Sequence, residues 1–291
     1  MNVSFILPVR NEKEYISTAL HSILHQKALN DYEIIFSDGS SDDGTLELIN
    51  VFLSDFPNLK LIHNPNKIVS SGFNLALNEA KGDIIIRVDG HCELPPNYVE
   101  KCIELLHKQD AYIVGGRIAT ISKGIVGKAI AKAQSSWFGV GGVKFRSTKN
   151  KRGGYVESLA FGVHRRELFA NIGGYDEQMI CNQDDEFNFR AIQAGKKIWM
   201  DPTIKIKYYS RSSFSNLFKQ YFTQNLFIEL MRHGLEDEKK TEHLFIKISS
   251  DWKLMIDLTY SQKSYGYIEG VYLKYRRHGD NITNKYKLRI I

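Results

Sequence analysis

Cysteine is scarce in this chain of 291 residues. The three cysteines, Cys92, Cys102 and Cys181, are an odd number, widely spaced and without a CxxC pair. This pattern argues against a disulfide framework and against a zinc knuckle, and it is typical of proteins in a reducing cytosol. With 43% hydrophobic residues the chain is long enough to fold around its own apolar core.

Long apolar runs are also missing. No window approaches the ~18 uninterrupted apolar residues of a membrane-spanning helix. The start, "MNVSFILPVRNE", has neither the basic segment nor the long apolar segment of a signal peptide. We therefore expect a cytoplasmic protein whose membrane role, if it has one, is peripheral docking on the inner face of the cell membrane.

Glycine is absent from the turn that follows the first apolar run, "PVRNEKE". A dinucleotide-dependent oxidoreductase needs a G-x-G-x-x-G turn at this place, so this class is excluded. A sugar-phosphate nucleotidyltransferase would share an α/β core and metal-binding carboxylates, but it would also want a glycine-rich turn here. It remains an alternative, as does a nucleotide-sugar-binding protein that has lost its chemistry.

Positive charge is in excess and lies late in the chain. The net charge is +6, and the tail "KYRRHGDNITNKYKLRII" holds many Lys and Arg residues against a single Asp. Such a tail can attract phosphate groups or anionic lipid, but it is as often a solvated end. We expect no nucleic-acid partner.

The first ~110 residues alternate short apolar runs with amphipathic stretches, which is the pattern of βα units. The predicted strands are 3–7, 33–36, 59–62, 83–88 and 111–114. The stretches between them carry helical apolar stripes, and the fourth, "NYVEKCIELLHK", follows two prolines. The predicted fold is therefore α/β, a doubly wound and mostly parallel sheet with flanking helices.

The sequence divides into a large domain and an extension. Residues 1–225 form the predicted domain, with a nucleotide-binding half (1–114) and an acceptor half (115–225). The Gly, Ser and Lys-rich stretch 115–155 is expected to be a flexible loop. Residues 226–291 are rich in aromatic and basic residues, and we expect a helical extension that packs on the core, self-associates into a homo-oligomer or docks on an anionic membrane surface.

Polar residues follow three of the predicted strands. The loops "PVRNE", "SDGSSDDGT" and "DGHCE" come directly after strands one, two and four. Because open α/β sheets bind ligands beyond the carboxyl ends of their strands, these loops should converge on one ligand site.

The loop "SDGSSDDGT" has a structural and a functional interpretation. Ser41 or Asp42 can cap the helix that begins near Thr45, and Asp, Gly and Ser are ordinary turn residues. Asp38, however, falls immediately after the buried run, where its carboxylate could accept the N–H of a nucleotide base.

Asp89 and His91 are candidate metal ligands. Residues i and i+2 of an extended backbone face the same way, so both side chains can address one cation, and Gly90 between them permits close approach of a diphosphate. Mg²⁺ and Mn²⁺ in nucleotide chemistry are usually held by few protein ligands together with phosphate oxygens. A structural role for the pair stays open.

The stretch Gln183-Asp184-Asp185-Glu186 is a candidate site for a general base. Three acids at a helix start are favoured by the helix dipole, which could account for them fully. The preceding "GGYDE" would turn the chain sharply and bring the acids back over the sheet edge, where a carboxylate could accept a proton from a hydroxyl.

Residues 3 to roughly 225 resemble the family-2 inverting glycosyltransferases of GT-A fold, in particular those of bacterial exopolysaccharide biosynthesis of the succinoglycan type. Four motifs carry the resemblance, in the same order as in that family: "ILPVRNE", "SDGSSDDGT", "GDIIIRVDGH", and "GGYDE" followed by "QDDEFNFR".

The resemblance implies a role for each matching position. Pro8, Arg10 and Glu12 would shape the nucleotide pocket, and Asp38 would contact the base. Asp89 would approach the nucleotide and, with His91, the metal. Asp184 would be the catalytic base, and Arg211, Lys219 and Gln220 would meet the leaving diphosphate.

Three positions depart from the family pattern. Ser37 stands where the family often has the first of two Asp residues, and Gln183 replaces the usual Glu before the base. His91 replaces the second metal-binding Asp, which favours Mn²⁺ over Mg²⁺. The Q-x-x-R-W signature of polymer-building members is missing from the stretch "YYSRSSFSNLFKQYF", so processive synthesis is not expected.

The function implied is metal-dependent, inverting transfer of a hexosyl group from a nucleotide-diphosphate sugar, a UDP-sugar by preference. The acceptor would be a hydroxyl of a saccharide or a lipid-linked acceptor in cell-surface polysaccharide biosynthesis.

Overall fold

The computed structural model describes residues 2–27, 31–124, 127–128, 145, 152–179 and 181–210 with their side chains, and beyond them the backbones of four strands. The chain divides into two compact units, 1–227 and 228–291. This division lies two residues from the predicted domain boundary. The two units are described separately below.

The first half of unit 1 is a parallel sheet. It contains β1 (Val3–Val9), β2 (Tyr32–Asp38), β3 (Leu59–His63) and β4 (Ile84–Arg87), in the order β3-β2-β1-β4. All three neighbouring pairs are parallel, as predicted. Every residue of β1 and β4 is buried, which explains why these strands are continuous apolar runs with little alternation.

The second half of the same sheet is mixed. The short strand β8 (Val163–Arg165) is antiparallel to both β4 and β6 (Ile113–Ile121), and so joins the two halves. Strand β9 (Ile198–Tyr209) is parallel to β6 and also pairs in antiparallel fashion with β5 (Cys92–Glu93) and β7 (Gly154–Tyr155).

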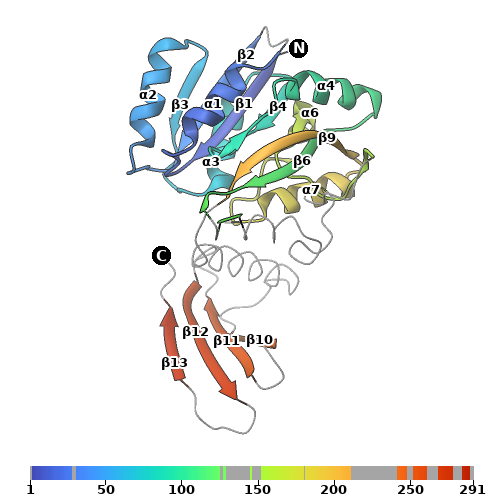
Figure 1. Ribbon diagram of the computed structural model, residues 1–291. Helices are drawn as coiled ribbons and strands as arrows, with labels where there is room; N and C mark the ends of the chain where they lie inside the picture. Colours follow the sequence, from blue (N-terminus) through green and yellow to red (C-terminus); the bar gives the residue numbers. More distant parts are fainter. Residues whose placement is uncertain are drawn as a thin grey trace. The chain divides into compact units, whose positions relative to one another are not determined.

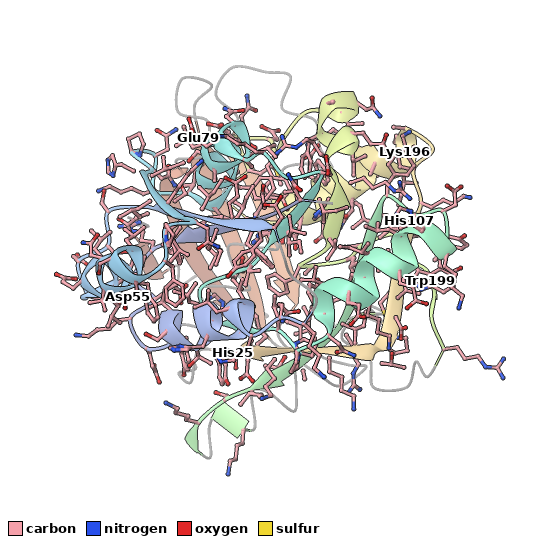
Figure 2. The ribbon with its side chains drawn as sticks, turned by 90° about the horizontal axis from the view of Figure 1, so that it is seen from above. His25, Asp55, Glu79, His107, Lys196 and Trp199 are labelled. Carbon is pink, nitrogen blue, oxygen red and sulfur yellow. The ribbon has the colours of Figure 1, made fainter. Side chains whose placement is uncertain are left out.

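Helices cover both faces of this sheet (Figures 1 and 2). One face carries α1 (Ile16–Leu24), α2 (Thr45–Asp55) and α4 (Tyr98–Lys108). The other carries α3 (Val69–Glu79), α6 (Arg166–Ile172) and α7 (Gln183–Gln193). In Figure 2, His25 and Asp55 beside the ends of α1 and α2 lie to the left, and His107 of α4, Lys196 and Trp199 lie to the right.

Aromatic rings join α3, α6 and α7 into one layer. The ring centroids of Phe73 and Phe169 are 5.7 Å apart, and those of Phe169 and Phe187 are 5.0 Å apart. Tyr175, in the segment before α7, stacks on Phe73 at 4.3 Å. Aromatic pairs at such distances add to the energy of burial, so α7 and the segment before it are held firmly against the sheet.

The prediction that residues 115–155 form a flexible loop is wrong at the start of this range. Residues 115–121 belong to β6, and both glycines at its centre are buried. A Cβ atom on Gly116 would lie 2.5 Å from the carbonyl oxygen of Ile204, so glycine here allows β9 to approach closely. Most of 122–155 lies outside the described residues.

The prediction that residues 226–291 are helical is also wrong in the part that the structure describes. Unit 2 contains an antiparallel sheet of β10 (Thr241–Lys247), β11 (Trp252–Tyr260), β12 (Ile268–Arg277) and β13 (Asn284–Leu288), in that order. The aromatic and β-branched residues of this region favour strands, and their spacing is closer to a period of two than of 3.6. Among the described helices, none has the length and apolar character that crossing a membrane requires.

Candidate active site

The three polar loops do converge, as predicted. Val9 at the end of β1 is in register with Asp38 at the end of β2, and the amide of Gly39 donates to the carbonyl of Val9 at 2.9 Å. The Asn11 side chain crosses to the second loop and donates to Asp42 Oδ1 at 2.8 Å. The ends of β1 and β2 therefore form one rim, and the third loop joins it through Glu12.

Asp38 is 3% exposed and organises its own loop. Its two carboxylate oxygens accept from the amide of Ser41 at 3.0 Å and from the Ser41 hydroxyl at 2.5 Å. Neither Ser41 nor Asp42 caps α2, contrary to the structural interpretation of this loop. The residue directly before α2 is Gly44, and Asp43 Oδ1 accepts from the amide of Thr45, the first residue of the helix, at 2.9 Å.

Glu12 and His91 form a pair across two loops. The distance between Glu12 Oε1 and His91 Nδ1 is 2.9 Å, and both side chains are largely buried. A Cβ atom on Gly90 would lie 2.7 Å from Glu12 Cγ. Glycine at position 90 therefore makes room for the Glu12 side chain. The sequence had instead suggested that Gly90 permits the close approach of a diphosphate.

Asp89 is bound by an arginine that the sequence analysis gave no role. Arg87, the last residue of β4, is 5% exposed, and its Nε donates to Asp89 Oδ1 at 3.0 Å. Burial alone would lower the pKa of Arg87, but its neighbours Asp89, Tyr175 and Asp184 raise it. The signal in the sequence is an arginine inside the apolar run "DIIIRV", since a buried strand carries a charge only when it is paired.

The donor set at this edge suits a cation that is shared with a substrate. Within the described part of the chain, no group of three or more His, Cys, Asp or Glu residues is placed to hold a metal ion. Asp89 and His91 lie in the turn after β4 and not on an extended strand as expected, and they offer one carboxylate, bonded to Arg87, and one imidazole, bonded to Glu12. Such a pair fits Mg²⁺ or Mn²⁺ that takes its remaining ligands from diphosphate and water.

Asp184 lies in the first turn of α7, as predicted. Burial raises its pKa, Arg87 lowers it, and Asp185 and Asp89 raise it further. Asn182 just before the helix has a left-handed backbone with φ of 58°, a conformation that Asn tolerates better than most residues. Asp184 therefore lies within the electrostatic reach of Arg87 and Asp89, although it is far from both in the sequence.

The segment before α7 is anchored by residues that the sequence analysis missed. Asn74 of α3 accepts from the amide of Tyr175 at 2.9 Å and donates to its carbonyl at 2.8 Å. Ser70, one turn earlier, donates to the carbonyl of Met179 at 2.9 Å. Arg190 of α7 donates to the carbonyls of Ile172 and Gly174. These contacts fix the turn that delivers Asp184.

The other candidate residues are placed as follows. Pro8 is buried within β1 and opposite Ser37 of β2. Arg10 is exposed. It lies beside Gly39, where a Cβ atom would be 3.4 Å from Arg10 Cβ. Arg211, Lys219 and Gln220 lie outside the described residues.

The sequence of this chain is similar to those of known proteins. The model of "Glycosyl transferase family 2" matches residues 4–173, more than half of the chain. The chain is 32% identical to succinoglycan biosynthesis protein ExoA of Rhizobium meliloti over 224 residues, which cover 75% of this chain and 66% of that protein. It is 30% identical over 227 residues to a dolichyl N-acetyl-α-D-glucosaminyl phosphate 3-β-D-2,3-diacetamido-2,3-dideoxy-β-D-glucuronosyltransferase of Methanococcus voltae, over 75% of this chain and 70% of that protein.

Solved structures show the same fold. The crystal structure of S. aureus TarS 1-349 in complex with UDP superposes with a TM-score of 0.55 at 18% identity, covering 78% of this chain and 65% of that chain. The complex of the same protein with UDP-GlcNAc gives a TM-score of 0.56 at 18% identity, over 73% and 60% of the two chains.

The fold is thus of the GT-A type, and the class of protein is that of the glycosyltransferases. This chain belongs to glycosyltransferase family 2. It spans about two thirds of the length of the first relatives that it matches.

Proposed function

We propose that this protein transfers a hexosyl group from a UDP-sugar to an acceptor hydroxyl with inversion at the anomeric carbon, in the biosynthesis of a cell-surface polysaccharide. The proposal is supported by Asp184, a carboxyl in the first turn of α7 whose pKa is raised by burial, with Asp89 of the loop after β4 among its electrostatic neighbours. The TarS structures with UDP and UDP-GlcNAc support this choice of donor, and the succinoglycan protein supports the pathway class.

Inverting transfer is a single displacement. The acceptor oxygen attacks the anomeric carbon from the face opposite the nucleoside diphosphate, as the C–O bond to the diphosphate breaks through an oxocarbenium-like state. Asp184 accepts the proton of the attacking hydroxyl. A carboxyl whose pKa is raised by burial is a better proton acceptor than a solvated one, provided that it is ionised when the acceptor arrives.

The nucleotide is held at the other side of the site. We assign base recognition to Asp38 and contacts with the ribose and diphosphate to Pro8, Arg10 and Asp89. Asp89 and His91 would hold Mn²⁺ or Mg²⁺, which neutralises the departing diphosphate when bound. Glu12 orients the His91 ring through the bond to Nδ1. Arg211, Lys219 and Gln220 remain candidates for diphosphate contacts.

Substitution of the base tests the proposal. Asp184→Asn should lower turnover by ~10²–10⁴, because this is the usual contribution of a general base, with UDP binding largely kept. Turnover is measured as UDP release from UDP-sugars in the presence of Mn²⁺ and saccharide acceptors. Turnover within a few-fold of the unmodified protein would reject Asp184 as the base.

The alternative is a protein that binds nucleotide sugars without transferring them. The same assay separates the two functions, since a binding protein would show a UDP-induced rise in melting temperature but no release of UDP from any donor.

A further inference from the structure

Phe161 has a backbone conformation that a bulky residue seldom adopts. It lies in the segment between β7 and β8, and its φ angle is 57°, in the left-handed region. This region is unfavourable for a large side chain, and residues that are held there by the surrounding structure cluster at functional sites. The Phe161 side chain is 6% exposed, so its ring is fixed inside unit 1.

Three elements of unit 1 hold this segment in place. The Phe161 carbonyl accepts a hydrogen bond from the buried Tyr98 hydroxyl of α4 at 2.5 Å. The Leu159 carbonyl accepts one from the Asn188 side chain of α7 at 2.9 Å. Gly115 of β6 lets the segment approach closely, since a Cβ atom there would lie 2.8 Å from Leu159 Cδ2. Contacts with α4, α7 and β6 therefore maintain the left-handed backbone.

The ring of Phe161 meets the residues that support both candidate metal ligands. The guanidinium carbon of Arg87 lies 5.8 Å from its centroid, and Arg87 Nε donates to Asp89 Oδ1 at 3.0 Å. The Tyr208 ring, near the end of β9, stacks on Phe161 with the two centroids 5.9 Å apart. Tyr208 in turn meets the His91 ring edge to face, with the centroids 4.7 Å apart. One side chain thus contacts the neighbours of Asp89 and of His91.

We propose that Phe161 is a positioning residue of the donor site: its ring holds Arg87 and Tyr208, and through them Asp89 and His91, in the arrangement that receives a divalent cation with the diphosphate. The inference rests on the proposed function, in which Asp89 and His91 hold Mn²⁺ or Mg²⁺. Residues behind metal ligands matter for metal affinity because they fix the orientation of the ligands. The unfavourable backbone at Phe161 is kept because it places the ring against both supports.

Urea unfolding tests the backbone of Phe161 without any ligand. Phe161→Gly and Phe161→Ala both remove the ring, but only glycine adopts a positive φ freely. We expect the urea midpoint of Phe161→Gly to lie above that of Phe161→Ala. The matched pair Phe169→Gly and Phe169→Ala in α6 should show the opposite order, because glycine is unfavourable inside a helix. An alanine variant at position 161 that is at least as stable as the glycine variant would overturn the strained backbone on which the proposal depends.

Calorimetric titration with UDP tests the role of the ring. In the presence of Mn²⁺, Phe161→Leu should weaken UDP binding about 10–100-fold, the usual effect of losing a residue behind a metal ligand. With EDTA in place of Mn²⁺, its affinity for UDP should equal that of the unmodified protein, because the loop after β2 with Asp38 is unchanged. The matched control is Phe169→Leu, the same change at a ring that is 7% exposed and belongs to the aromatic layer of α3, α6 and α7. It should equal the unmodified protein under both conditions.

Tyr208→Leu is the second variant, and it takes the place of Phe161→Leu should that protein fail to fold. It removes the ring between Phe161 and His91, so it should also weaken UDP binding only when Mn²⁺ is present. Equal UDP affinities of Phe161→Leu and Phe169→Leu with Mn²⁺ overturn the proposal, as does a loss of affinity that is the same with Mn²⁺ and with EDTA. If the unmodified protein releases no UDP from any donor, the proposed transfer is wrong, whereas these titrations need no turnover and still decide the role of Phe161.

Discussion

At the scale of single residues, Asp184 carries a charge that its surroundings disfavour. Burial and two neighbouring acids raise its pKa, and Arg87 compensates only in part. The folded state therefore binds the proton of Asp184 more tightly than the unfolded state does. Asp184 therefore lowers the free energy of unfolding at pH values above the ordinary pKa of Asp, about 3.9.

Asp184→Asn should consequently stabilise the protein at neutral pH. The gain should shrink as the pH falls toward the ordinary pKa of Asp, because both states are then protonated. Urea unfolding at several pH values measures it, with Asp83→Asn at an exposed position as control. A destabilised Asp184→Asn variant at neutral pH would mean that the carboxylate is stabilised by its site.

The bond between Glu12 and His91 predicts the metal requirement. Glu12→Gln should raise the Mn²⁺ concentration needed for half-maximal turnover by about 10–100-fold, as loss of a carboxylate behind a metal-binding imidazole usually does. His91→Ala should raise it at least as much. His25→Ala, on the surface beside α1, is the control. Unchanged metal titrations for both site variants would assign the pair to packing.

At the scale of elements, the path of the chain into α7 depends on α3. Asn74 makes two hydrogen bonds to the backbone of Tyr175, and its side chain sits so close to Gly174 that a Cβ atom there would clash with it. A substitution of Asn74 should therefore affect Asp184, the proposed base, indirectly through the segment before α7.

Asn74→Ala should lower the free energy of unfolding by about 1–3 kcal/mol, because it leaves buried backbone groups without partners. Turnover should fall with it, since the turn that delivers Asp184 loosens. Asn78→Ala, one turn later and exposed on the same helix, should change neither. Urea unfolding and UDP release measure both effects, and equal behaviour of the two variants would refute the anchoring role.

The parallel half of the sheet could be predicted from the sequence because its strands are continuous apolar runs between amphipathic helices. The convergence of the loops followed from that topology alone. Strand β8 could not be predicted, since three residues carry no periodicity. The anchors Asn74 and Ser70, and the Arg87 contact with Tyr175, are long-range contacts that no local pattern encodes.

At the scale of the whole molecule, the chain comprises two units with different sheets. The strands of unit 2 are not evident from the sequence, because over the whole of residues 226–291 the aromatic residues mix with Lys and Arg at irregular intervals, and the period of two appears only within the separate strands. All candidate site residues, including the three that lie outside the described part, fall within residues 1–227.

A protein cut after residue 227 should therefore bind UDP as the full chain does. Calorimetric titration of both forms with UDP and Mn²⁺ measures this. Loss of binding in the shorter form would show that unit 2 contributes to the donor site. The docking on an anionic membrane that we expect of residues 226–291 is a separate question, which flotation of both forms with anionic liposomes decides.

The central claim is that the loops after β1, β2 and β4 form one site for a nucleoside diphosphate. The most direct measurement is calorimetric titration of the full chain with UDP and Mn²⁺, up to about 1 mM, the upper end of ordinary substrate constants. We predict binding of one UDP per chain that is weakened in Asp38→Asn and in Asp89→Asn and kept in Asp83→Asn. Absence of binding, or binding that neither site substitution alters, would contradict the account.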